Sequence, residues 1–260
     1  MDGSAGDFID QRLASGCVAF PLADLVKKSG LAVTVARNQL LRLENRVTRV
    51  SPRRQFFLIV SPEHRAVGAP PVARWLHDYL QWLSEPYYLA LQSTASSFGS
   101  NPQALQVTQV LTRITRRPLE IGRIRIQFFV KRTVEQTPTQ PLANVYAPLQ
   151  FSTPEATTFD LVQYATSVGG IGRTVETLAP LLPLLRPAEL RRVLKIEDKP
   201  ATAQRLGFVL EKLRATGLAK AVENWLPSNL IFVPLVPGIR GDAPEFKRWK
   251  ILNNSVELGR

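Results

Sequence analysis

The sequence has few of the residues that build covalent or metal-bound cores. Its 260 residues include one cysteine, Cys17, and two histidines, His64 and His77. A single cysteine excludes an internal disulfide and any cysteine-based metal cluster. No spacing of histidine and carboxylate residues indicates zinc, and no glycine-rich phosphate loop of the P-loop type is present. The sequence therefore predicts neither a metal nor another cofactor.

Long hydrophobic runs are also missing. The best candidate for a membrane segment, residues 177–185, is too short and is interrupted by Pro180 and Pro183. The first ten residues carry three aspartates and no basic apolar leader, so no secretory signal is expected. We therefore expect a cytoplasmic protein with no membrane partner.

Positive charge is what the sequence has in excess. Thirty-three lysines and arginines stand against 21 aspartates and glutamates, a formal net charge of +12. The hydrophobic fraction of 45% is typical of a globular protein, and the length predicts one or two domains. Such a charge favours a polyanionic partner, above all nucleic acid. The alternative is a basic surface that only keeps the protein soluble.

The N-terminal 60 residues predict one compact unit. Apolar spacing indicates a helix over residues 7–13, and an extended piece follows at residues 17–20. Pro21 is expected to be the first residue of a second helix, which Gly30 ends. A third helix, "VTVARNQLLRLEN", precedes the hairpin "RVTRVSPRRQFFLIV", whose tip carries Arg53 and Arg54. This is the element order of a winged helix-turn-helix, whose second paired helix enters the major groove of DNA.

Residues 21–60 concentrate the charge. They hold eight cations and two acidic residues, so half of the net charge lies in about a sixth of the chain. Arginine and asparagine suit guanine and adenine edges, and cations near phosphates release condensed counterions. Three alternatives stay open: Thr34 caps the third helix, Arg42 and Arg46 only face water, and Arg49 points either way. The residues predicted to contact DNA are Lys27, Lys28, Thr34, Arg37, Asn38, Arg42, Arg46, Arg49, Arg53 and Arg54.

The remainder predicts a larger mixed domain. Residues 63–71 are rich in proline and glycine and indicate a linker. Helices are expected at 72–83 and 84–98, and strands at 104–112, 119–131 and 143–151. Ser152, Pro154 and Glu155 form a helix-start pattern for a helix that ends near Gly169 and Gly170, with Glu155 in a capping role. The fold class is therefore α+β, with a winged helix-turn-helix at 1–62, a linker at 63–71 and a mixed α/β domain at 72–260.

A second basic cluster follows the predicted linker, with Glu120 as its only acidic neighbour in the sequence. It would extend a DNA footprint, bind RNA or meet a protein; the alternative is a solvated sheet edge whose cations prevent strand pairing. Its members are Arg113, Arg116, Arg117, Arg123 and Arg125, with Lys131 and Arg132 close behind.

Little in the sequence indicates catalysis, so we expect no enzyme. One alternative is a nucleic-acid-processing enzyme, a nuclease or a nucleotidyltransferase-like fold, in which Glu155 and Asp160 bind a metal. Another is a regulator whose C-terminal domain holds a small molecule. His77, between aromatic residues on a predicted helix, is expected to be a surface or packing residue.

Four stretches, in order, resemble the AbiEi-type antitoxins of type IV toxin–antitoxin systems. They are "SGLAVTVARNQLLRLENR" with "PRRQFFLIVSPEH", "EPYYLALQSTASSFGSNPQALQVTQVLTRITRRPLEIGRIRIQFF", "FSTPEATTFDLVQY" and "RWKILNNSVEL". The chain departs from the family pattern at Ala32, where relatives usually have serine or threonine, and at Gln55, where many have glycine.

The resemblance implies a phage-defence protein with two roles. One is a transcriptional autorepressor whose winged helix binds inverted repeats in the double-stranded DNA of its own operon promoter and self-associates there. The other is an antitoxin whose larger C-terminal part neutralises a nucleotidyltransferase-like toxin without needing a stable complex.

Overall fold

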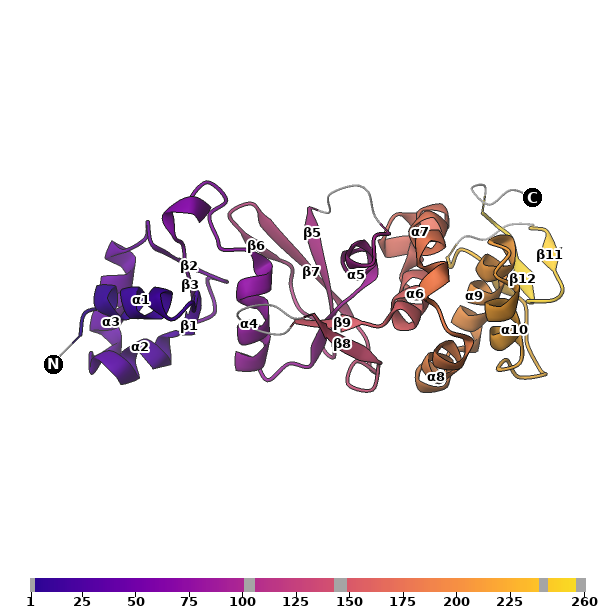
Figure 1. The fold of residues 1–260 in the computed structure, drawn as a ribbon, viewed down its shortest axis with the longest axis horizontal. Helices are drawn as coiled ribbons and strands as arrows, with labels where there is room; N and C mark the ends of the chain where they lie inside the picture. The colour runs from indigo at the N-terminus through magenta and orange to yellow at the C-terminus, as the bar shows by residue number, and fades with distance from the viewer. Residues whose placement is uncertain (1–2, 101–105, 143–148, 239–242, 256–260) are drawn as a thin grey trace. The chain divides into compact units, whose positions relative to one another are not determined.

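The computed structural model describes residues 3–100, 106–142, 149–238 and 243–255. It is a mixture of helices and several sheets, as predicted (Figure 1). The chain divides into two compact units. The first comprises Met1–Tyr88, Gln106–Arg132 and Pro141–Gln150, and the second Leu89–Leu105, Thr133–Gln140 and Phe151–Arg260. The domain limits expected from the sequence stay a prediction.

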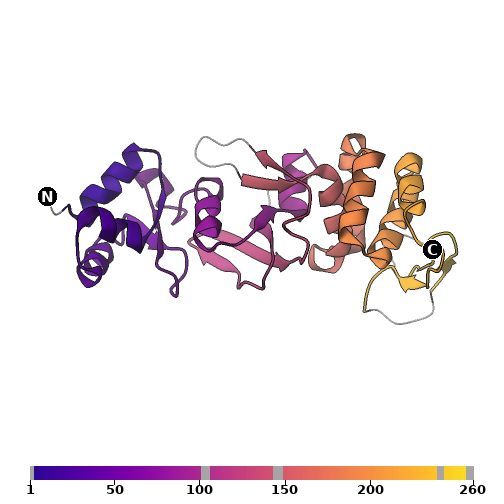
Figure 2. The ribbon, with the colours of Figure 1, turned by 90° about the horizontal axis from the view of Figure 1, so that it is seen from below.

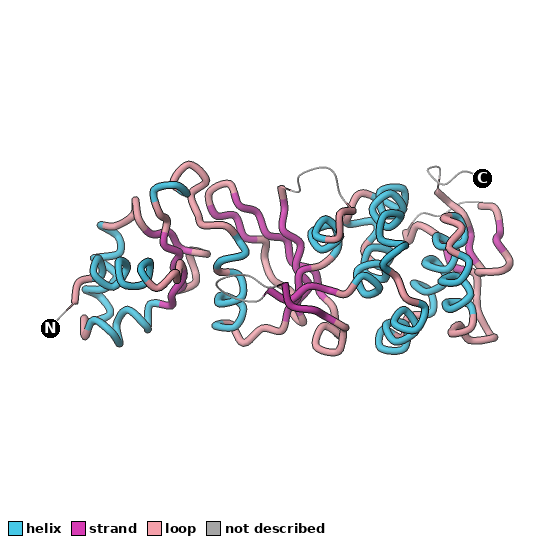
Figure 3. Tube along the Cα trace, in the orientation of Figure 1, coloured by secondary structure: helices cyan, strands magenta, loops and turns pink. Residues whose placement is uncertain are grey.

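Three helices and a small sheet form the N-terminal part of the first unit. They are α1 (Ala5–Ala14), β1 (Ala19–Pro21), α2 (Leu22–Ser29), α3 (Val33–Arg42), β2 (Val47–Arg49) and β3 (Phe56–Ile59). Both strand pairs are antiparallel, in the order β1-β3-β2. Figure 3 distinguishes the strands from the helices by colour. Pro21 ends β1 and precedes α2, so its expected place as the first helical residue is wrong. Its extended ψ of 149° continues the strand.

Local chemistry explains these N-terminal helices. Ser4 and Asp7 form a capping box that satisfies the first free N–H groups of α1. Gly30 adopts a φ of 71° at the end of α2, a conformation that glycine tolerates without steric cost. The helices bury Phe8, Leu25 and Leu40, among others, against one face of the sheet.

The other face of the sheet is covered by α4 (Leu76–Trp82). The Phe56 ring lies 5.3 Å from the ring centroids of Tyr79 and Trp82. Phe56 is 1% exposed, and aromatic burial of this kind contributes about 0.5–1.5 kcal/mol per ring pair beyond the area buried. The N-terminal sheet is thus packed on both faces.

The segment expected to be a linker is ordered within the first unit. It contains two short 3₁₀ turns, η1 (Pro62–His64) and η2 (Val72–Arg74). Between them Gly68 lies against Gly122, and Arg123 N donates to Val67 O at 2.8 Å. A Cβ atom on Gly122 would come within 2.1 Å of Val67 O, so only glycine fits this approach.

A six-stranded sheet has the order β6-β7-β5-β4-β9-β8. Its strands are β4 (Tyr87–Leu89), β5 (Val107–Thr112), β6 (Leu119–Ile121), β7 (Ile124–Val130), β8 (Thr139–Leu142) and β9 (Leu149–Ser152). Strands β5 and β7 run parallel, with Thr112 opposite Val130. Residues 143–148 of the strand expected at 143–151 lie outside the described residues.

The single helix expected over 84–98 is wrong. Residues 87–89 form β4, and helix α5 (Leu91–Ser97) follows. Tyr87 and Tyr88 favour a strand because aromatic side chains pack well on a pleated, buried surface. Leu91, with a φ of 56°, marks the change of direction.

The second unit is mainly helical beyond the sheet (Figures 1 and 2). Its helices are α6 (Pro154–Gln163), η3 (Ala165–Ser167), α7 (Gly170–Leu178), η4 (Ala179–Leu184), α8 (Pro187–Glu197), α9 (Pro200–Lys212) and α10 (Thr216–Glu223). A small sheet, β10-β12-β11, comprises β10 (Val233–Pro234), β11 (Glu245–Phe246) and β12 (Ile251–Leu252).

Three expectations for α6 are wrong. Thr153, not Ser152, caps the helix, since its Oγ1 accepts a hydrogen bond from Ala156 N at 3.3 Å. Glu155 does not cap this helix: its Oε1 accepts from Arg186 N at 2.9 Å. The helix ends at Gln163, before the expected Gly169.

A polar and aromatic group, here called the C-terminal clasp, consists of Glu211, Glu223, Arg248 and Trp249. Arg248 donates at 2.9 Å to Glu211 and twice to Glu223, and Trp249 Nε1 donates to Glu211. Trp249 is fully buried against Gly207 of α9. The clasp therefore fastens the C-terminal strands to α9 and α10.

Within the described ranges, no helix combines the length and the apolar character needed to cross a membrane.

Candidate nucleic-acid interface

Helix α3 presents a polar outer face. Ala36 and Leu40 are buried, and the outer face carries the exposed residues Thr34, Arg37, Asn38 and Arg42. The helix begins after Ala32, which forms no side-chain cap. Thr34 lies inside the first turn, so the alternative that Thr34 is the cap residue is wrong. Its hydroxyl is exposed on the same face as Arg37 and Asn38.

The hairpin of β2 and β3 ends in a tight turn. Arg54 N donates to Ser51 O at 3.0 Å, and Val50 N donates to Phe56 O at 3.1 Å. Arg53 and Arg54 are exposed at this turn. Their positive charges lie on a short, hydrogen-bonded tip and not on a long flexible loop.

Two predicted contact residues have partners inside the unit. Arg46 forms an ion pair with Asp10 of α1, so its charge is partly neutralised. The Arg49 guanidinium lies 5.5 Å from the centre of the Phe57 ring, which fixes the direction that the sequence left open. A cation over an aromatic face contributes about 0.5–1 kcal/mol at an exposed site.

Helix and hairpin meet at a shallow groove of about 90 Å³. Arg37 and Leu41 line it from α3, and Thr48 and Arg49 line it from β2. Of the predicted contact residues, the groove brings together Arg37 and Arg49.

Six of the ten predicted residues are exposed cations without an ion pair in the described part of the chain. Lys27 and Lys28 lie in the last turn of α2, Arg37 and Arg42 on α3, and Arg53 and Arg54 at the hairpin tip. Their exposure leaves these charges accessible to a partner and screened by water and salt.

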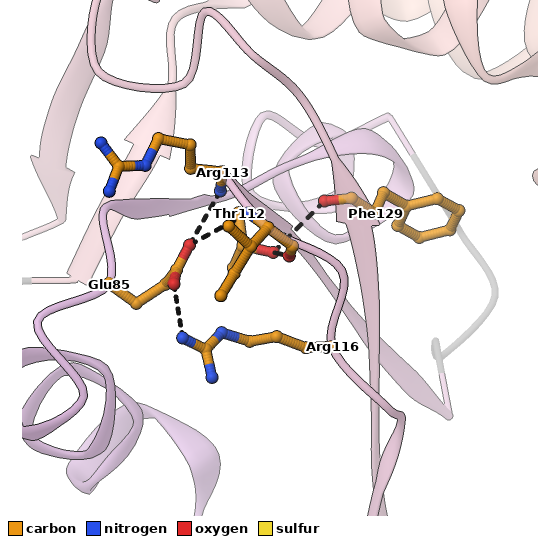
Figure 4. Close-up of polar contacts among 6 residues, drawn as sticks. Glu85, Thr112, Arg113, Arg116 and Phe129 are labelled. Carbon is orange, nitrogen blue, oxygen red and sulfur yellow. Dashed lines mark hydrogen bonds and ion pairs between the residues drawn. The ribbon is translucent and has the colours of Figure 1, made fainter.

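The second basic cluster contains a buried carboxylate that the sequence analysis missed (Figure 4). Glu85 is 6% exposed and accepts hydrogen bonds from Arg113 N at 2.9 Å and Ile114 N at 3.3 Å. Its other oxygen forms an ion pair with Arg116. In the folded chain, Glu85 is therefore an acidic neighbour of this cluster in addition to Glu120. Glu85 precedes the arginines by 28 residues or more, and no short-range pattern signals that contact.

The members of this cluster differ in character. Figure 4 shows the Arg116 guanidinium directed toward Glu85 and that of Arg113 directed away from it. Arg117 and Arg123 are exposed, and Arg125 lies 4.0 Å from Glu120. Of the two following cations, Arg132 is exposed, whereas Lys131 is 2% exposed and lies 5.6 Å from the Tyr88 ring. The cluster therefore presents fewer surface cations than the sequence suggests.

One arginine of the hairpin tip and one of the second basic cluster both affect the pKa of a tyrosine on α4. Burial raises the pKa of Tyr79, and the positive charges of Arg54 and Arg116 oppose that shift by favouring the phenolate.

The carboxylates considered for catalysis are enclosed. Asp160 is fully buried and Glu155 is 4% exposed, with the Arg186 N–H as its partner. Among the described residues, no group of three histidine, cysteine or carboxylate side chains is placed to hold a metal. His77 has a packing role, as expected, because its ring nitrogen lies 2.9 Å from the Tyr87 hydroxyl.

A cavity of about 410 Å³ opens beside the C-terminal clasp. Phe208 and Phe246 line it, and Lys212 lies 5.5 and 5.2 Å from their ring centres. The Lys212 side chain therefore lies over both aromatic rings that line this cavity.

Comparison with known proteins identifies the class of the C-terminal part. Residues 88–212 match the family model of the AbiEi antitoxin C-terminal domain. The match covers just under half of the chain, and it confirms the resemblance to AbiEi-type antitoxins.

Two solved structures are similar. The RV2827C protein from Mycobacterium tuberculosis has a TM-score of 0.70 at 15% identity, over 98% of this chain and 92% of that chain, which shows a shared fold. An antigenic nucleotidyltransferase-like protein from Paracoccidioides brasiliensis has a TM-score of 0.39 at 13% identity, over 58% and 90% respectively; this similarity is too low to support an argument. No curated protein matches the chain.

Proposed function

We propose that this chain is a DNA-binding autorepressor and an antitoxin. Residues 5–60 act as a winged helix-turn-helix, with α2 and α3 as the helix pair and the β2–β3 hairpin as the wing. Helix α3 lies in the major groove of inverted repeats in the promoter, and Arg53 and Arg54 follow the phosphate backbone. The observation that carries this proposal is the set of six exposed cations without ion pairs on these three elements.

The electrostatics favour DNA over simple solvation. Duplex DNA carries one negative charge per about 1.7 Å of its axis, and each neutralised phosphate releases counterions. The exposed Arg37, Asn38 and Thr34 then face base edges, where arginine suits guanine and asparagine suits adenine.

The antitoxin role rests on the family match of residues 88–212. We propose that the C-terminal part counteracts a nucleotidyltransferase-like toxin encoded beside it. Co-expression with the product of the neighbouring reading frame tests this: the chain should restore growth that the product alone arrests. Continued arrest, with the chain present in soluble form, would remove the antitoxin role.

A gel-shift titration on the chain's own promoter fragment tests DNA binding. The Arg53→Ala/Arg54→Ala variant should bind more weakly, and the slope of log K against log salt should become shallower by about one to two units, at about 0.9 per lost phosphate contact. Arg37→Ala or Asn38→Ala should instead change base preference by about 1–3 kcal/mol at the base read.

The matched control is Arg191→Ala/Arg192→Ala on α8, two adjacent exposed arginines of the second unit. This variant removes the same charge, so it separates local contact from net charge. Equal binding by wild type and the hairpin variant at every salt concentration would contradict the wing assignment. Arg113→Ala/Arg117→Ala, in the same titration, tells whether the second basic cluster belongs to the footprint.

A further inference from the structure

Helix α3 displays apolar side chains on the face that the proposed function turns toward DNA. Leu41 is 62% exposed and Val33 is 45% exposed, with the exposed Arg37 between them. Exposed Leu41 is the largest apolar side chain on this face. Neither residue belongs to the core cluster, which includes Ala36 and Leu40; Val33 borders that buried side of the helix, and Leu41 lies about 100° from Leu40.

The three residues form one stripe. At about 100° per residue, Val33 and Arg37 lie about 40° apart around the helix, and Arg37 and Leu41 do as well. The rise of about 1.5 Å per residue places Val33 and Leu41 about 12 Å apart along the axis, the length of about three to four base pairs.

The major groove offers one apolar group to such a stripe. The C5-methyl group of thymine projects there beside the polar edges that arginine reads. A 5-methylcytosine presents the same methyl at the same ring position. We infer that Val33 and Leu41 read pyrimidine 5-methyl groups on either side of the base that Arg37 contacts, an inference that rests on the proposed placement of α3.

A protein partner is the competing occupant of this stripe. Arg37 lies between the two apolar side chains of the stripe, and Asn38 and Arg42 are exposed on the adjoining side of the helix. Residues 33–42 contain no acidic side chain, so every charged side chain of this helix is positive. That charge favours a polyanionic duplex over a protein surface of mixed charge.

The test uses the chain's own promoter fragment, amplified either with dTTP or with dUTP. Replacing thymine by uracil removes only the methyl group and keeps every hydrogen-bonding atom. Wild type should bind the uracil fragment about fourfold more weakly for each contacted methyl, the equivalent of about 0.8 kcal/mol. For the Leu41→Ala and Val33→Ala variants, the difference in affinity between the thymine and uracil fragments should be smaller than for wild type.

Leu184→Ala is the matched control. Leu184 is 44% exposed and belongs to η4 of the second unit, outside the elements that the proposed function assigns to DNA. This variant should keep the full difference between the two fragments. A third fragment, with thymine and enzymatically methylated cytosine, tests the second source of the methyl: a gain in affinity over the unmethylated fragment shows that 5-methylcytosine is also read, and no gain leaves thymine as the source.

The outcomes separate this inference from the proposed function. Equal wild-type affinity for the thymine and uracil fragments overturns the methyl contact and leaves DNA binding intact, provided the methylated fragment also shows no gain. Binding to neither fragment removes the proposed function and this inference together. A third outcome is that the Leu41→Ala variant keeps the full affinity difference between the two fragments but no longer forms a dimer, as measured by light scattering. This outcome would assign the stripe to self-association and overturn the inference.

Discussion

Replacement of Gly207 by alanine should destabilise the second unit, although alanine usually stabilises a helix relative to glycine. Gly207 lies in the middle of α9, where alanine is normally favoured by about 1 kcal/mol. A Cβ atom at this position would lie 2.0 Å from Cζ3 and 2.3 Å from Cε3 of Trp249. Carbon atoms in ordinary contact are about 3.5–4.0 Å apart, so helix and indole must separate by about 1.5 Å.

The indole has little freedom to make that room. Trp249 is fully buried, its Nε1 donates to Glu211, and Gln204 donates to its carbonyl oxygen at 2.9 Å. Overpacking a well-filled core costs about 1–3 kcal/mol, and the rigid ring places this site at the upper end. After subtraction of the helix preference, the expected net loss is about 2 kcal/mol, or about 4–8 °C in Tm.

Thermal and urea unfolding, followed by circular dichroism, measure this loss. The control is Gly217→Ala on α10, where a Cβ atom meets nothing within 4 Å; it should leave stability unchanged or raise it by up to about 1 kcal/mol. In a Trp249→Leu background the Gly207→Ala cost should shrink, because the smaller side chain leaves space for the methyl. A Gly207→Ala protein as stable as Gly217→Ala would refute the packing argument.

Three further changes test other contacts by unfolding measurements. Glu85→Gln breaks a buried ion pair and should cost about 3 kcal/mol, whereas Glu120→Gln, in an exposed pair at 4.0 Å, should cost less than about 0.5; equal costs would contradict this. Arg248→Ala should lower stability by up to about 1 kcal/mol, more at low salt. Its hydrogen bond lowers the pKa of Glu223 below the ordinary 4.5, so this contribution is present above pH 4.5 and is lost as pH falls through the lowered pKa; a loss that does not depend on pH would contradict the assignment. Thr153→Ala removes the α6 cap and should cost about 1 kcal/mol, and an unchanged urea midpoint would count against the cap.

Local patterns predict the N-terminal elements well. Ala36 and Leu40 give α3 its buried side at helical spacing, and Gly30 ends α2. These signals lie within a few residues of the element they specify, so a single sequence contains them. The places of Arg53 and Arg54 at an exposed turn follow from the same local reasoning, although their contact with DNA stays a prediction.

Long-range contacts explain what the sequence analysis missed. Glu85 reads as part of a helix start, yet it is a buried acceptor for Arg113, Ile114 and Arg116. Arg46 looks like one more basic residue until Asp10 of α1 lies beside it. Periodicity reports which side of an element is buried, not which distant carboxylate shares its environment.

The packing of α4 on the N-terminal sheet limits how this part of the chain can be exchanged between proteins. A fragment that ended at residue 62 would leave Phe56 without Tyr79 and Trp82 and would expose a wide aromatic surface to water. Such a surface promotes aggregation. Recombination, in evolution or in the laboratory, would need to move residues 1–83 together, so that the helix travels with the sheet it covers.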